Sequence, residues 1–89
     1  MLKSKKVELD GEEFEVREPT IEGMLPVLKK LGNEEQRMEA QVDILKITVF
    51  KNGVAMGDQV NALGWSMFSR LVPHALSVCG MTEDDDDAA

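Results

Sequence analysis

The feature that most restricts the fold is an Asp-Gly pair, Asp10-Gly11, between two segments in which apolar and charged residues alternate. The apolar members of these segments are Val7, Leu9, Phe14 and Val16. Alternation of this kind places one set of side chains on one face of a strand, and Asp-Gly readily adopts the positive φ angles of a two-residue turn. The sequence therefore predicts a β-hairpin over residues 5–17.

A two-residue turn would fix the register of this hairpin. It would place Val7 opposite Phe14, and it would also place Glu8 opposite Glu13. Because like charges directly opposite each other are unfavourable, a longer or bulged turn remains open. Two strands alone are marginal in water, so the apolar face of the hairpin must pack on helices.

Helical spacing of apolar residues predicts three helices after the hairpin, at about residues 20–31, 34–51 and 58–79. Their expected N-caps are Thr20, Asn33 and Asp58. Pro26 either kinks the first helix or delays its start to about Met24, and Pro73 is expected to kink the third. Residues 44–50 are rich in β-branched side chains and could form a strand, but their continuity with a capped helix favours helix.

The predicted fold is thus α+β and mostly α, with a short N-terminal hairpin followed by about three helices. Residues 1–80 would form a single small domain, and residues 81–89 would be a disordered acidic tail. Glu83 and residues 84–87 account for five of the seventeen acidic residues, and the rest of the chain has twelve acidic and ten basic residues. A nearly neutral body with no cluster of Lys and Arg on a helix argues against a nucleic-acid-binding module.

The single cysteine, Cys79, excludes an intramolecular disulfide, and with one histidine, His74, the chain lacks the ligands of a zinc site. We expect no metal and no cofactor. No apolar run reaches the eighteen residues of a membrane span, and the start of the chain lacks the pattern of a signal peptide, so a soluble cytoplasmic protein is predicted. No phosphate loop or nucleophile motif is present, and Cys79 and His74 are poorly spaced on a helix to act together, so we do not expect an enzyme.

The apolar side chains instead indicate a protein that binds other proteins. Six methionines accompany only four aromatic residues, and methionine suits both the filling of a small core and contact with varied apolar partners. The third predicted helix is apolar over more than the single stripe that a small domain needs. The residues predicted to contact a partner, or to mediate self-association, are Trp65, Phe68, Leu71, Val72 and Leu76, followed by Met24 and Leu28.

A hairpin that ends in Val16-Arg17-Glu18-Pro19-Thr20 and leads into helices resembles the tail assembly chaperones of long-tailed phages and prophages. The stretches Leu71-Val72-Pro73 and Val78-Cys79-Gly80 are similar to the closing helix of that family, although Gly23 and Pro26 disturb the helix after the first motif. The similarity covers about residues 5–80, and its one tight motif is five residues long.

The resemblance implies that the chain binds the long helical tape measure protein and keeps it from aggregating in the host cytoplasm before the tail tube forms. Many members of that family are also made in a longer form by a programmed frameshift, and the extension recruits tail tube protein. The acidic end of this chain would then lie near the point where such an extension is joined. A second interpretation is a small prophage adaptor or regulator that binds one folded partner in a one-to-one complex.

Overall fold

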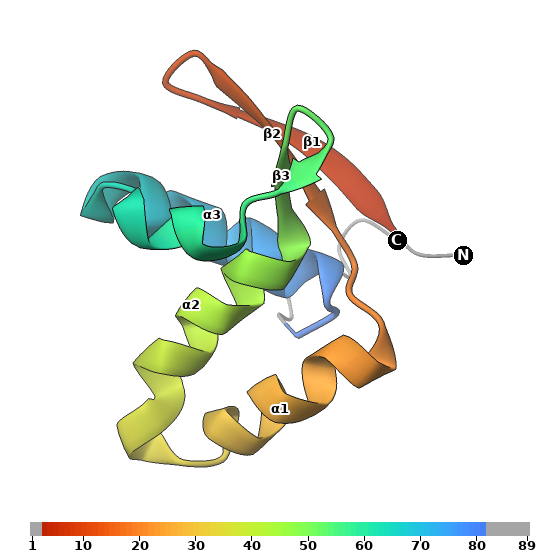
Figure 1. Cartoon of the computed structure of the whole chain (residues 1–89), viewed down its shortest axis with the longest axis vertical. Coiled ribbons are helices and arrows are strands. Elements are labelled where there is room, and N and C mark those ends of the chain that lie inside the picture. Colours follow the sequence, from red (N-terminus) through yellow and green to blue (C-terminus); the bar gives the residue numbers. More distant parts are fainter. Residues whose placement is uncertain (1–2, 82–89) are drawn as a thin grey trace.

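The computed structural model describes residues 3–81. The elements along the chain are β1 (Ser4–Leu9), β2 (Glu12–Arg17), α1 (Ile21–Leu31), the 3-10 helix η1 (Glu34–Gln36), α2 (Arg37–Thr48), β3 (Val49–Lys51), β4 (Val54–Ala55), the 3-10 helix η2 (Gly57–Ala62) and α3 (Trp65–Val78). In Figure 1 the strands lie at one end of the molecule, and α1 lies at the other end beside α2.

The N-terminal hairpin forms where the sequence predicts it. Asp10 and Gly11 have φ angles of 53° and 81°, as a two-residue turn requires. Val7 pairs with Phe14, and the like-charged Glu8 and Glu13 do lie opposite each other. The turn is therefore the short one, with no bulge between the paired strands.

The predicted fold class is wrong in its account of the sheet. Four antiparallel strands in the order β1-β2-β3-β4 replace the isolated hairpin. The predicted helix of residues 34–51 is divided into η1, α2 and β3, because Val49 pairs with Val16 of β2 and the chain reverses at Asn52-Gly53. Those two turn residues have φ angles of 57° and 82°, so a second hairpin stands where a helix end was expected.

Substitution of Gly53 by alanine is expected to destabilise the fold by about 1 kcal/mol, because a Cβ atom is strained at its φ of +82°. Gly32 is a matched control, since its φ of −75° suits any residue and a Cβ there meets only ordinary contacts. Chemical denaturation should show a lower midpoint for Gly53→Ala and no loss for Gly32→Ala. Equal effects of the two substitutions would contradict this account of the β3-β4 turn.

The first helix begins at Ile21, and of the two possibilities the delayed start at Met24 is wrong. Thr20 caps it, with its hydroxyl oxygen accepting a hydrogen bond from the backbone N–H of Gly23 at 3.1 Å. The helix continues through Pro26, and Gly32 forms its C-cap. Asn33 caps η1 and not α2: its side chain accepts a hydrogen bond from the N–H of Glu35 at 2.9 Å, whereas α2 begins after Gln36 without a side-chain cap.

The predicted third helix of residues 58–79 is also divided. Residues 57–62 form η2, and α3 starts only at Trp65, after Gly64 in extended conformation. Asp58 lies inside η2 and does not cap it; its carboxylate lies 3.5 Å from the ammonium group of Lys46. The α3 helix continues through Pro73 to Val78.

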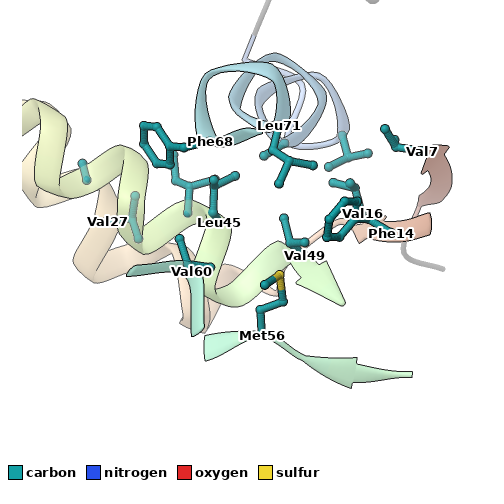
Figure 2. Close-up of a cluster of buried hydrophobic side chains, with 14 residues drawn as sticks. Val7, Phe14, Val16, Val27, Leu45, Val49, Met56, Val60, Phe68 and Leu71 are labelled. Atoms are coloured by element: carbon teal, nitrogen blue, oxygen red, sulfur yellow. The ribbon is translucent and has the colours of Figure 1, made fainter. Parts of the chain in front are cut away.

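The hydrophobic core lies between the sheet, α2 and α3 (Figure 2). Val7, Phe14 and Val16 form the buried face of the first hairpin, as the alternating pattern predicts. The helices contribute further buried residues, which include Val27, Ala40, Ile44, Leu45, Phe68, Leu71, Ala75 and Val78. No helix within residues 3–81 is long and apolar enough to cross a bilayer. Apart from Met81, the predicted acidic tail lies outside the described residues.

Candidate protein-binding surface

The seven residues predicted to contact a partner do not form one surface. Trp65 and Leu28 are 68% and 47% exposed, whereas Phe68 and Leu71 are 7% and 0% exposed. The remaining three, Val72, Leu76 and Met24, are partly buried and pack against the core. Helix α3 contacts α2 and both strands of the first hairpin, so most of its broad apolar surface is used within the fold.

One open apolar groove lies at the start of α3, and we call it the Trp65 groove. It has a volume of about 280 Å³ and is lined by Met38, Val42, Val60, Asn61, Leu63, Trp65 and Phe68. Among these described residues only Asn61 is polar, so the groove suits an apolar side chain. Met38 is 51% exposed at this groove, and its flexible thioether can adapt to partners of different shape.

Local sequence explains why Trp65 remains exposed. Gly64 is the extended N-cap of α3, so Trp65 is the first helical residue and no preceding turn of helix covers it. Its ring packs on Phe68, with the ring centroids 5.4 Å apart and the planes inclined by 31°. The buried ring of Phe68 thereby supports the exposed indole, which presents a broad apolar face next to the groove.

A second apolar surface lies on α1, and we call it the α1 stripe. It consists of Ile21, Leu25 and Leu28, which are 81%, 53% and 47% exposed and recur at helical spacing on one face. A groove of about 260 Å³ adjoins the stripe, and its lining residues are Glu18, Pro19, Thr20, Ile21, Met24, Leu28, Cys79 and Met81. Met24 and Leu28 are among the predicted contact residues, whereas Ile21 and Leu25 are not.

The motif that carries the family resemblance makes contacts inside the chain. The guanidinium of Arg17 lies 4.0 Å from the ring centroid of Phe50 and donates a hydrogen bond to Glu15 at 2.9 Å. This hydrogen bond lowers the pKa of the Glu15 carboxyl below its usual value. The N–H of Glu18 donates to the carbonyl of Lys3 at 2.7 Å. Together with the Thr20 cap, these contacts fix the junction between β2 and α1.

The surroundings of Cys79 disfavour its thiolate form. Its thiol is half buried, and burial together with the nearby charge of Glu18 raises its pKa to about 11. Since the thiolate is the reactive form, iodoacetamide at neutral pH should alkylate Cys79 at least about tenfold more slowly in the folded protein than in urea. Mass spectrometry measures the alkylation, and equal rates in the two states would contradict this placement of the thiol.

No group of three or more His, Cys, Asp or Glu side chains within residues 3–81 is arranged to hold a metal ion. Comparison of the chain with models of protein families, with curated proteins and with solved structures finds no match.

Proposed function

We propose that this protein is a phage or prophage tail assembly chaperone that binds apolar helical stretches of the tape measure protein through the Trp65 groove. The observation that carries the proposal is an indole that is 68% exposed beside an open groove lined almost entirely by apolar side chains. Large exposed apolar side chains of this kind mark sites of protein interaction. The resemblance of residues 16–20 to the chaperone family supplies the identity of the client.

In the proposed mode, an amphipathic client helix places an apolar side chain in the groove and packs against the face of Trp65. Met38 adjusts to whichever side chain arrives, so the site tolerates varied client sequences. Several copies bind along the extended client, and their weak contacts add through multivalency. In the host cytoplasm, assembling tail tube protein would then displace the bound copies.

Trp65 is the one tryptophan of the chain, so its fluorescence reports on the groove directly. We expect a saturable blue shift of its emission when a helical tape measure peptide is titrated into the protein, because the bound peptide removes water from the indole. A peptide in which serine replaces the apolar stripe is the control and should cause no shift. Binding without a change in emission would place the client elsewhere. A one-to-one complex with a globular protein, and none with the peptide, would favour the adaptor interpretation.

A further inference from the structure

Helix α1 is covered by the rest of the protein on one side only. Within Ile21–Leu31 only Val27 is fully buried, and α1 packs chiefly on α2. Figure 1 shows α1 at the edge of the molecule, at the end away from the turn of the first hairpin. The α1 stripe faces away from Val27, and among residues 3–81 it adjoins only the groove that ends at Cys79 and Met81, so its three side chains remain about half exposed or more.

Two exposed charged residues of opposite sign border the α1 stripe on the same edge. Glu22 lies in the first turn of α1 and Lys29 in the last. They are seven residues apart, which is about two helical turns, so both project in nearly the same direction. The other lysine of the last turn, Lys30, lies on the side of α2 and makes ion pairs with Asp43 at 2.7 Å and Glu39 at 3.2 Å.

In two copies of α1 that pack face to face, Glu22 of one copy can pair with Lys29 of the other only when the helices run antiparallel. When two identical helices pack antiparallel, the same edge of each helix meets across the interface. Glu22 of one copy then lies near Lys29 of the other, and the two-fold axis repeats the pair. A parallel pair would instead bring opposite edges together and leave these charges without partners. Antiparallel packing also aligns the two helix dipoles favourably.

We propose that two copies of this protein associate through antiparallel α1 helices, with Leu25 of the two copies in contact near the two-fold axis. Ile21 of each copy then approaches Leu28 of the other. The eleven residues of α1 span only about 16 Å. A helix of this length offers less than the roughly 800 Å² per partner of a standard stable interface, so the dimer exchanges with the monomer. The Trp65 groove is built from α2, η2 and α3 and stays outside this interface.

Sedimentation equilibrium over a series of concentrations tests the proposal. The mass of the native protein should rise from 9.9 kDa towards twice that value. Leu25→Glu should raise the dissociation constant of the dimer at least tenfold, whereas Val54→Glu, at a site that is 68% exposed on β4, should leave it unchanged. A native protein that stays monomeric up to about millimolar concentration would overturn the proposal, as would equal effects of the two variants.

A charge exchange tests the orientation. Glu22→Lys and Lys29→Glu should each weaken the dimer about threefold, because each introduces two like-charged contacts. The double variant should restore the native dissociation constant. Each substitution also opposes the dipole of α1, so only recovery of pairing across the interface explains a rescue by the double variant. A double variant as weak as the single ones would overturn the antiparallel arrangement. Binding of tape measure peptide, read from Trp65 emission, should be unaffected by Leu25→Glu, which separates this proposal from the proposed function.

Discussion

Replacement of Leu71 by alanine is expected to lower the free energy of unfolding by about 2 to 5 kcal/mol, the range for a leucine removed from a packed core. Leu71 is 0% exposed and points from α3 into the space between Leu45 of α2 and Val16 of β2 (Figure 2). Its removal would leave a cavity where the sheet, α2 and α3 meet. A chain of 89 residues has a small core, so this loss is a large part of its total stability.

Urea denaturation followed by far-UV circular dichroism measures this effect. Leu71→Met keeps the volume of the side chain and should cost less than about 1.5 kcal/mol. Val54→Ala, at a residue that is 68% exposed, should change stability by no more than about 0.5 kcal/mol. A cost below about 1 kcal/mol for Leu71→Ala would mean that α3 is not anchored as described.

Trp65→Ala is expected to weaken binding of the tape measure protein about 30-fold while the fold remains intact. Truncation of an aromatic anchor at the centre of an interface typically costs about 2 kcal/mol of binding free energy or more. A loss of about 2 kcal/mol raises the dissociation constant about 30-fold. Because Trp65 is 68% exposed, its truncation removes little buried apolar surface and should leave the free energy of unfolding nearly unchanged. Leu71→Ala and Trp65→Ala therefore affect different properties, although both residues lie on α3.

Isothermal titration of tape measure peptide measures the binding, and circular dichroism confirms the fold of each variant. Val54→Ala removes an exposed apolar side chain of β4 that does not line the groove, so this variant should bind as the native protein does. Met38→Ala, at a second exposed side chain of the groove, should weaken binding by a smaller factor than Trp65→Ala. Native affinity in both groove variants would show that the client binds elsewhere.

The first hairpin was predictable because its signal is local. Asp10-Gly11 determines the turn and the register, and the alternating residues around it determine the buried face. The second hairpin carries a signal of the same kind in Asn52-Gly53, but this pair equally suits the end of a helix, and residues 34–51 have helical periodicity. The three residues of β3 are too short to show alternation. They become a strand through pairing with β2, which is more than thirty residues away in sequence.

The candidate surface was predictable only in part, since periodicity shows that a helix has an apolar face and not what covers that face. On α3 the core takes Phe68 and Leu71 and leaves Trp65 at the surface. On α1 the apolar spacing predicts one apolar face, yet Val27 faces inward while Ile21 and Leu25 remain exposed. The difference arises because α3 contacts both the sheet and α2, whereas α1 lies at the edge of the fold.

The proposed function implies that a tape measure protein is encoded beside this gene, and coexpression of the two proteins tests the proposal most directly. The account predicts that the tape measure protein aggregates when it is expressed alone. In the presence of this chain it should stay in the supernatant, in a complex whose mass by light scattering corresponds to several copies per client. A tape measure protein that aggregates equally with and without this chain would contradict the account, as would a neighbouring region that encodes no long helical protein.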